Sequence, residues 1–493
     1  MKGGDILSLS LLSVSSFIAD LSPVARTIFS IAIMLIGGYG MTRLTKLLKL
    51  PNTTAYLLVG IILASLHLVS DDVINGSQFL PDIALAFISF STGEYLKLDV
   101  LKRSGIKVLV ITILESLFAS ILIFILTYFI LGLSLPYALI LSSIASSTAA
   151  AAIMMIIRQT GSKGDFVNTL LLIIAIDNIL ALLSYSIMIS ISSNIIAGTA
   201  FSLFFIIKPI LINILVLVIG GLFGLFLVLL LKKRSTDNRL IISIALLFGF
   251  CGICAILDIS PLLGCMSMGI VYGNVSKDDK LFKQLNYFSP PILLLFFVRS
   301  GLTFDLSALG SSSATLGPTP LIVIAILYFL IRIIGKYSGT FIGCLVTKKE
   351  KNIRNYLGMA LIPQTSVAIG LVALAHRTLA TLGYGEEGIA LQSIILAASF
   401  IGEMIGPACA KLSLYLSKSY SNNIEELAPV EEQTPTGEKK NEVDILIDRI
   451  KKIQETIPKH EFNEEETAYN EAIDEQNNYY MQYNNRHKNW RRK

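Results

Sequence analysis

Two ionisable side chains of opposite charge lie inside long apolar stretches of this 493-residue sequence. Asp177 is near the middle of the apolar run from about residue 169 to 191, and Lys336 is inside a second run from about 321 to 346. An unpaired charge is costly at such a position, and in a membrane-spanning segment it marks an ion or proton pathway by default. A carboxylate holds either a proton or a small cation. The two residue types therefore indicate ion binding.

The composition indicates which structural elements carry these charges. Hydrophobic residues make up 53% of the chain and charged residues 15%, whereas soluble domains carry about 25% charged residues. The apolar segments are mostly about 18 to 28 residues long, which is enough for a helix to cross a hydrocarbon core of roughly 30 Å. The alternating pattern of barrel strands is absent. We therefore predict an all-α polytopic membrane protein.

The apolar segments predict about thirteen transmembrane helices. Lys and Arg concentrate in alternate connections, such as 97–107, 232–239 and 348–354. The positive-inside rule then places the N-terminus outside and the C-terminus in the cytoplasm, and an odd number of spans agrees with this orientation. The predicted spans are 24–47, 53–70, 80–96, 106–132, 136–157, 166–191, 203–231, 239–257, 259–275, 288–305, 318–346, 355–376 and 388–417.

The two ends of the chain differ from the membrane region. Residues 1–23 are too short and too polar for a span, and we interpret them as an interfacial segment rather than a cleaved signal peptide. Residues 419–493 are polar and acidic and predict a cytoplasmic, partly disordered tail. A short amphipathic stripe from Val443 to Ile457 would dock on the protein itself or on a twin subunit. The tail as a whole is a candidate for binding a cytoplasmic partner.

No motif in the sequence indicates an enzyme. A P-loop, a GxGxxG after a strand and a His/Cys ligand set are all missing, and the chain has four His. We expect no cofactor, no metal other than a transported monovalent cation, and no nucleic-acid partner. The classes that remain are a secondary transporter and a channel in the lipid bilayer.

Two spans have sequences typical of interrupted helices. The fifth contains a run of small and polar residues from Ser142 to Ala152, and the twelfth contains Pro363, Gln364 and Thr365. Transporters place their sites where helices are interrupted near the bilayer midplane. Small residues also allow close helix packing, but both runs neighbour charge-bearing spans. Along the chain the order is interruption, Asp177, Lys336, interruption. This order is nearly a mirror image and predicts two inverted repeats.

Several motifs occur in the order typical of one family. The segments SSIASSTAAAAIMMIIRQTGSKG and IIAIDNILAL, together with FFVRSGLTFDLSAL, GKYSGTFIG, LIPQTSVAIGL and GEMIGPACAKL, resemble bacterial monovalent cation:proton antiporters. The resemblance is to their second family, which includes two-aspartate sodium/proton exchangers and Kef-type potassium systems. It covers about residues 24 to 418.

The resemblance implies an architecture. It suggests a homodimer in the cell membrane, with dimerisation spans in 24–96 and 239–305 and a linker span at 203–231. A mobile core would comprise 106–191 and 318–417, with two discontinuous helices crossing at the ion site. Exchange of Na⁺ or K⁺ for protons would proceed by alternating access. The alternatives are an uncoupled cation channel or uniporter, and a transport-inactive sensor that acts through its tail.

The resemblance also implies roles for individual residues. Asp177 would be the carboxylate that binds the proton or the cation, and Lys336 its switching partner. Thr148, Ser147 and Asn178 would be cation ligands. The position at which the family usually has its ion-coordinating aspartate is Asn178, which carries no titratable proton. Either Asp177 alone carries the exchange, with altered stoichiometry, or coupling is lost.

Three further ionisable residues lie inside predicted spans. We expect Glu115, Glu403 and Arg332 to form ion pairs within the core. The alternatives are that the two glutamates line an ion path and that Arg332 extends toward a membrane interface. The motif around Glu403 favours a stabilising role over contact with the transported ion.

Overall fold

The computed structural model describes most of the membrane region of the chain. The described residues are 21–47, 52–66, 68–199, 203–231, 236–257, 259–276, 280–304 and 319–420. In these ranges the elements are helices and no β-strand occurs, which confirms the all-helical prediction. The predictions for most of the N-terminal segment and for nearly all of the C-terminal tail, including the stripe from Val443 to Ile457, lie outside the described residues.

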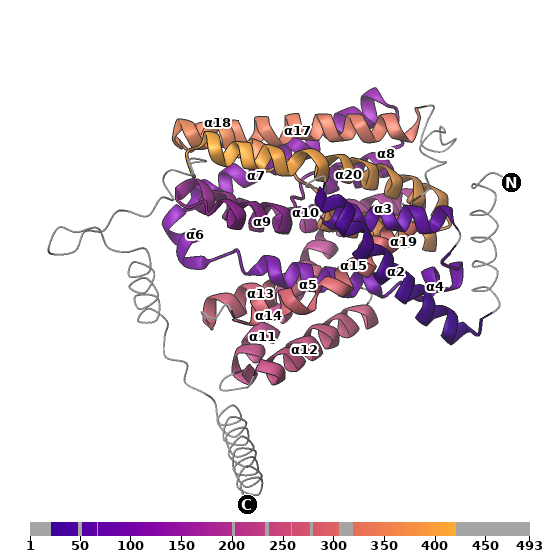
Figure 1. The fold of residues 1–493 in the computed structure, drawn as a ribbon. Coiled ribbons are helices and arrows are strands. Elements are labelled where there is room, and N and C mark those ends of the chain that lie inside the picture. Colours follow the sequence, from indigo (N-terminus) through magenta and orange to yellow (C-terminus); the bar gives the residue numbers. More distant parts are fainter. Residues whose placement is uncertain are drawn as a thin grey trace, which may run out of the picture. The chain divides into compact units, whose positions relative to one another are not determined.

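Every predicted span coincides with one helix or with two consecutive elements (Figure 1). Three short helices, α4 (Asp71–Gly76), α6 (Leu98–Ser104) and α14 (Lys280–Phe288), connect the longer ones. The elements at the spans are α2 (Pro23–Leu47), α3 (Asn52–Ser65), α5 (Leu80–Gly93), α7 (Ile106–Phe124) with the π-helix η1 (Ile125–Ile130), α8 (Leu135–Ile144) with α9 (Ala150–Thr160), α10 (Asp165–Ile196), α11 (Phe204–Leu231), α12 (Thr236–Ile256), α13 (Leu262–Val275), α15 (Pro290–Leu302), α17 (Leu321–Val346), α18 (Lys351–Ala360) with α19 (Ser366–Thr381), and α20 (Gly385–Leu416).

Seven helices of the described part are long and apolar enough to cross a membrane. Helices α14 and α15, which are bent by 48° against each other, would together make an eighth. Five shorter apolar helices of 10–17 residues accompany them. The chain is therefore a multi-pass membrane protein, while the number of thirteen spans stays a prediction.

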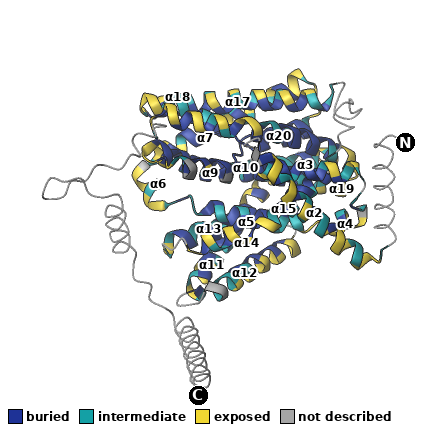
Figure 2. Ribbon diagram, viewed as in Figure 1, coloured by how far each residue is buried: buried dark blue, intermediate teal, exposed yellow. Residues whose placement is uncertain are grey.

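The long helices differ in how deeply they are buried (Figure 2). The most apolar windows of α10 and α20 are each 72% buried within the protein, whereas that of α2 is 17% buried. Helices α10 and α20 are thus interior helices. Because α10 carries Asp177, this carboxylate has protein rather than lipid around it.

Helices α7 and α17 pack against each other at glycines. Gly335, Gly339 and Gly343 recur every four residues and so lie on one face of α17. A Cβ atom at Gly339 would lie 2.7 Å from the Cα of Glu115, and one at Gly335 would lie 2.7 Å from the Cα of Ala119. Only glycine allows the two backbones to approach so closely. This approach brings Glu115 of α7 beside the face of α17 that carries Lys336.

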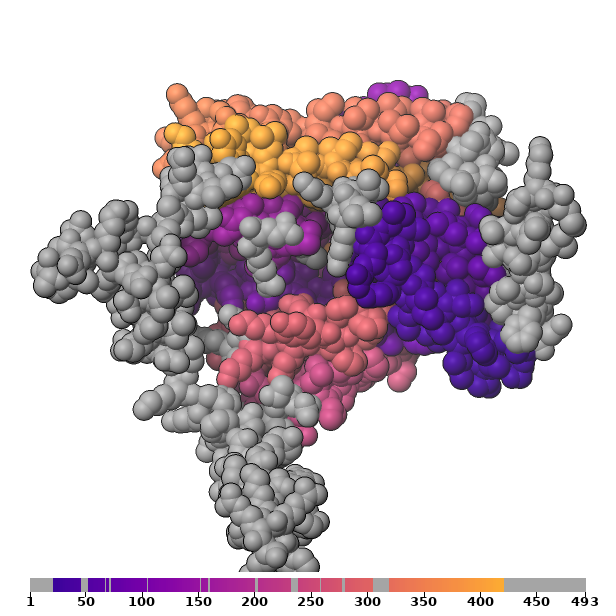
Figure 3. Space-filling model, in the orientation of Figure 1, coloured from indigo at the N-terminus to yellow at the C-terminus, as the bar shows by residue number. Residues whose placement is uncertain are grey.

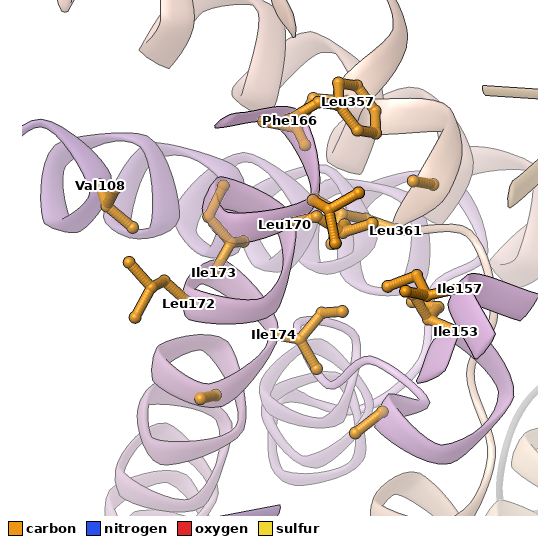
Figure 4. Close-up of a cluster of buried hydrophobic side chains, with 14 of the residues drawn as sticks. Val108, Ile153, Ile157, Phe166, Leu170, Leu172, Ile173, Ile174, Leu357 and Leu361 are labelled. Atoms are coloured by element: carbon orange, nitrogen blue, oxygen red, sulfur yellow. The ribbon is translucent and has the colours of Figure 1, made fainter. Parts of the chain in front are cut away.

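An apolar cluster surrounds the first half of α10 (Figure 4). It joins side chains of α9, α10 and α18 with those of α7, and its labelled members include Ile153, Phe166, Leu170, Ile173 and Leu357. All of these side chains are buried. Burial of an aliphatic side chain is worth about 1.5–3 kcal/mol relative to water, so this cluster fixes α10 against the interrupted helices.

The chain divides into two compact units. Residues 1–228 and 243–420 form the first, which holds all of the residues discussed below. The described part of the second unit consists of the end of α11 and the first part of α12. Within the first unit, α17 and α20 lie side by side, and their side chains form one continuous surface (Figure 3).

Candidate ion-binding site

Two helices are interrupted and contact each other at their interruptions. Residues 145–149 separate α8 from α9, and residues 361–365 separate α18 from α19. The backbone N–H of Ala149 donates to the carbonyl oxygen of Pro363 over 3.0 Å. The side-chain amide of Gln364 donates to the carbonyl oxygen of Ile144 over 3.1 Å. The two interruptions are therefore joined by direct hydrogen bonds.

The local sequence accounts for both interruptions. Pro363 has no backbone N–H and cannot continue the hydrogen-bond ladder of α18. In the other interrupted helix, the hydroxyls of Ser142, Ser143 and Ser147 donate to backbone carbonyls three residues earlier. Such hydroxyls compete with helix hydrogen bonds. Both breaks expose carbonyl oxygens that need new donors.

Arg332 of α17 supplies these donors. Its Nε donates to the carbonyl oxygen of Ala145 over 2.8 Å, Nη1 to that of Ile362 over 2.8 Å, and Nη2 to that of Ser147 over 2.6 Å. The side chain is fully buried. We predicted an ion pair with a carboxylate, but no carboxylate of the described ranges lies within ion-pair distance. The rigid guanidinium fork donates to three carbonyls at once. These carbonyls would lack a donor if Arg332 were paired with a carboxylate instead.

Lys336, one turn further along α17, holds two carboxylates. Its Nζ lies 2.7 Å from Oδ2 of Asp177 and also forms an ion pair with Oε1 of Glu115. The ammonium further donates to the hydroxyl of Thr148 over 2.7 Å and to the carbonyl oxygen of Ser146. None of the three charged side chains has exposed surface. The structure thus brings Asp177, Lys336 and Thr148 together.

Thr148 and Ser147 differ in what they contact. The hydroxyl of Thr148 donates to Oδ2 of Asp177 over 2.6 Å, so Thr148 touches both members of the ion pair. The hydroxyl of Ser147 donates to the carbonyl oxygen of Ile144 over 2.9 Å. Ser147 is therefore a neighbour of the charged group, connected to it through its own carbonyl and Arg332.

Asn178 is buried beside the site without bonding to it. Its side chain is 2% exposed, and neither its Oδ1 nor its Nδ2 has a hydrogen-bond partner in the described part of the chain. Oδ1 of Asp177 and Oε2 of Glu115 also accept no hydrogen bond there. Buried polar atoms are normally bonded, and exceptions need an explanation. The unbonded oxygens of the two carboxylates that contact Lys336 provide acceptors for a proton or a hard cation.

Glu115 is the residue whose place in the site the sequence did not reveal. We predicted a core ion pair for it, and the structure makes Lys336 its partner. The glycine spacing on α17 was the available signal, because it indicates where another helix can approach. With Arg332 nearby, the group contains two anionic and two cationic side chains when all are ionised.

Glu403 lies apart from this group. Its Oε1 accepts a hydrogen bond from Thr365 at 2.6 Å and its Oε2 one from Thr53 at 2.8 Å. No cationic side chain of the described residues lies within ion-pair distance of it. The predicted ion pair is replaced by two hydroxyl donors, which satisfy both oxygens of the carboxylate.

Comparisons with known proteins agree with this architecture. The family model described as "Sodium/hydrogen exchanger, transmembrane" matches residues 31–411. The iron transporter MagA of Paramagnetospirillum magneticum is 30% identical over 83 residues, which cover 17% of this chain and 19% of that relative. The chain thus spans about a fifth of that relative's length.

Solved structures show the same fold. A structure at pH 8 of the sodium proton antiporter MjNhaP1 from Methanocaldococcus jannaschii superposes with a TM-score of 0.64 at 17% identity, covering 80% of this chain and 99% of that one. A second structure, an electron-microscopy map of the same antiporter, gives a TM-score of 0.60 at 17% identity, covering 84% and 100%.

Proposed function

Because the chain belongs to the sodium/hydrogen exchanger family, we propose that it exchanges Na⁺ or K⁺ for protons at the group formed by Asp177, Glu115 and Lys336. Family membership supports cation:proton antiport as the activity. The observation that carries the proposed site is the buried ammonium of Lys336, which contacts both carboxylates beside the two helix interruptions.

The charges of this group favour competition between a proton and a cation. With two carboxylates and two cationic side chains ionised, the group is neutral. A bound proton or a bound monovalent cation each adds one positive charge. Holding both together would leave two excess positive charges in a medium of low dielectric, which is far less favourable than one. A site of this kind binds one ion at a time, which is the condition for exchange.

Glu115 can supply the second carboxylate that is missing at position 178. Asn178 cannot release a proton, and the sequence left open whether Glu115 forms a core ion pair or lines an ion path. In the structure Glu115 contributes a second carboxylate to the same ammonium. We propose that Asp177 and Glu115 together bind the ion, with Thr148 and Asn178 as oxygen ligands and Ser147 supporting the interruption. Exchange then needs no aspartate at position 178.

We further propose the complete architecture of the family. It has thirteen spans in inverted repeats, with the N-terminus outside and the two interrupted helices crossing at the site. The chain is a homodimer in the cell membrane, and the core moves against the dimerisation spans in alternating access. The bond from Ala149 to Pro363 supports the crossing. The tail, residues 419–493, is cytoplasmic and is available to a partner.

Flux measurements in proteoliposomes test the proposed site. Vesicles loaded with a pH-sensitive dye receive pulses of Na⁺, K⁺ or Li⁺, and the wild type is compared with Asp177→Asn and Glu115→Gln. We expect Asp177→Asn to abolish proton release and Glu115→Gln to reduce it at least tenfold. Asp99→Asn and Glu386→Gln, at exposed carboxylates, are the matched controls and should keep the wild-type rate.

Three outcomes would contradict the proposal. Equal rates for the wild type and Asp177→Asn would remove Asp177 from the site. Exchange that depends on Asn178→Asp, and is absent from the wild type, would show that Glu115 does not replace the missing aspartate. Cation flux without proton flux would instead identify an uncoupled channel.

A further inference from the structure

Glu403 of α20 joins two parts of the protein that are proposed to move against each other. Its Oε1 accepts a hydrogen bond from Thr365, in the interruption before α19, and its Oε2 accepts one from Thr53, the second residue of α3. Thr365 belongs to the proposed core, and Thr53 belongs to the proposed dimerisation spans. The carboxylate is buried. It thus makes one bond within the core and one bond out of it.

Gln392 repeats this arrangement in the first half of the same helix. Nδ1 of His376 in α19 lies 3.0 Å from Oε1 of Gln392, and Nε2 of Gln392 donates to the hydroxyl of Thr303 over 2.8 Å. His376 belongs to the proposed core, and Thr303, directly after α15, to the proposed dimerisation spans. Residues 392 and 403 are about three turns of an α-helix apart. Both crossing bonds therefore start from one face of α20.

The two threonines are carried by helices that are packed together. A buried apolar cluster joins α3 and α15 and includes Val59, Leu294 and Val298. The ion pair of Asp82 and Arg377 crosses the same boundary, but partly exposed ion pairs contribute little. A displacement of α20 along its axis relative to α3 and α15 would break the bonds to both threonines at once. The bonds of α20 within the core would be kept.

Glu403 is also connected to the interruptions beside the ion site. Its partner Thr365 directly follows Gln364, whose side-chain amide donates to the carbonyl oxygen of Ile144 at the other interruption. The bond from Thr53 to Glu403 therefore links α3 to the pair of interrupted helices. A change in this bond reaches the ion site without any contact between Glu403 and the transported ion.

We propose that Glu403 and Gln392 are positioning residues that hold the core in the orientation of this structure. Their bonds to Thr53 and Thr303 are made in this orientation and are lost when the core moves. They therefore stabilise this orientation against the opposite one. The inference rests on the proposed exchange by alternating access, and it names the contacts that set the balance between the two orientations.

Cation affinity measured separately at the two faces of the membrane tests this role. The half-saturating concentration at each face scales inversely with the fraction of protein open to that face. The ratio of the two concentrations thus reports the balance of orientations. The wild type, Thr53→Val and Thr303→Val are reconstituted in proteoliposomes in one orientation, and exchange is started by Na⁺ or K⁺ added to either face.

Both variants should change this ratio in the same direction. Thr303→Val should change it about fivefold, which is the factor for one neutral hydrogen bond. Thr53→Val should change it at least tenfold, because its hydroxyl bonds a carboxylate. Thr53→Ser keeps the hydroxyl and should restore the wild-type ratio. Thr27→Val is the matched control, at an exposed threonine of α2 whose hydroxyl donates to the carbonyl oxygen of Pro23 in its own helix.

Two results would overturn the proposal. Half-saturating concentrations that rise equally at both faces would give the two threonines a merely structural role. An unchanged ratio in both variants would show that their bonds do not favour either orientation. Either result leaves exchange by the wild type intact. A wild type without exchange would instead contradict the proposed function, and this inference with it.

Discussion

Nζ of Lys336 lies 2.7 Å from Oδ2 of Asp177, although 159 residues separate them and neither side chain is exposed. The same ammonium is paired with Glu115. One buried ammonium is thus the ion-pair partner of two carboxylates from two other helices. Its removal leaves both carboxylates without an ion-pair partner and leaves the group with one uncompensated negative charge inside the protein.

Lys336→Gln is expected to destabilise the protein through this uncompensated charge. Removing one partner of a buried ion pair costs about 3–5 kcal/mol. Adding Glu115→Gln should recover part of the loss, because one of the two unpaired carboxylates is then neutral. Thermal unfolding of the detergent-purified protein measures both effects in a double-mutant cycle. If the loss of stability in the double variant equals the sum of the losses in the two single variants, Glu115 and Lys336 do not interact.

Thr148→Val is expected to weaken cation binding without unfolding the protein. The substitution keeps the shape of the side chain but removes a hydroxyl that bonds both Asp177 and Lys336. In the proposed site this hydroxyl is also a ligand of the cation. If it contributes as much to the cation as a hydrogen bond to a charged group, about 1.5–3 kcal/mol, the half-saturating cation concentration should rise at least tenfold. Concentration series in proteoliposomes measure it. Thr148→Ser keeps the hydroxyl and should stay within about threefold of the wild type, and an equal loss in both variants would contradict the role of the hydroxyl.

Gly339→Ala is expected to separate α7 from α17. The new Cβ atom would lie 2.7 Å from the Cα of Glu115 and 2.7 Å from the carbonyl oxygen of Leu114. Overpacking costs about 1–3 kcal/mol, and the shift would move Glu115 away from Lys336. We expect a lower unfolding midpoint together with slower exchange. Gly249→Ala is the control, since nothing lies within 4 Å of a Cβ atom there. Equal midpoints for both variants would show that the helices do not require this glycine.

Cross-linking tests whether the proposed core moves against the dimerisation spans. Asp82 of α5 and Arg377 of α19 belong to the two proposed groups and form an ion pair. Joining Asp82→Cys to Arg377→Cys with a cleavable bifunctional thiol reagent should stop exchange, and cleavage of the reagent should restore it.

The matched control for this cross-link is the ion pair of Asp165 and Lys349, in which both residues belong to the proposed core and Oδ2 lies 2.8 Å from Nζ. A cross-link between Asp165→Cys and Lys349→Cys should leave exchange unchanged. Unimpaired exchange in the cross-linked Asp82/Arg377 variant would contradict alternating access by this movement.

Local properties of the sequence were sufficient to predict the helices and the burial of two charged residues. The length of an apolar run and the charged residues inside it are read directly from consecutive residues. The positions of α10 and α17 and the burial of Asp177 and Lys336 could therefore be inferred. The interruptions were also local, because Pro363 and the serine-rich run from 142 to 152 disturb helix hydrogen bonding where they stand.

Only the tertiary structure decided which charges meet. Glu115 reaches Lys336 because α7 approaches α17 at its glycines, and the rotation of each helix decides which side chain faces the other. Arg332 bonds carbonyls and Glu403 bonds hydroxyls because those groups were brought within reach by helices distant in sequence. Such contacts depend on how helices are packed and not on the sequence of any one of them. The sequence thus determined where buried charge occurs, and the packing of the helices determined its partners.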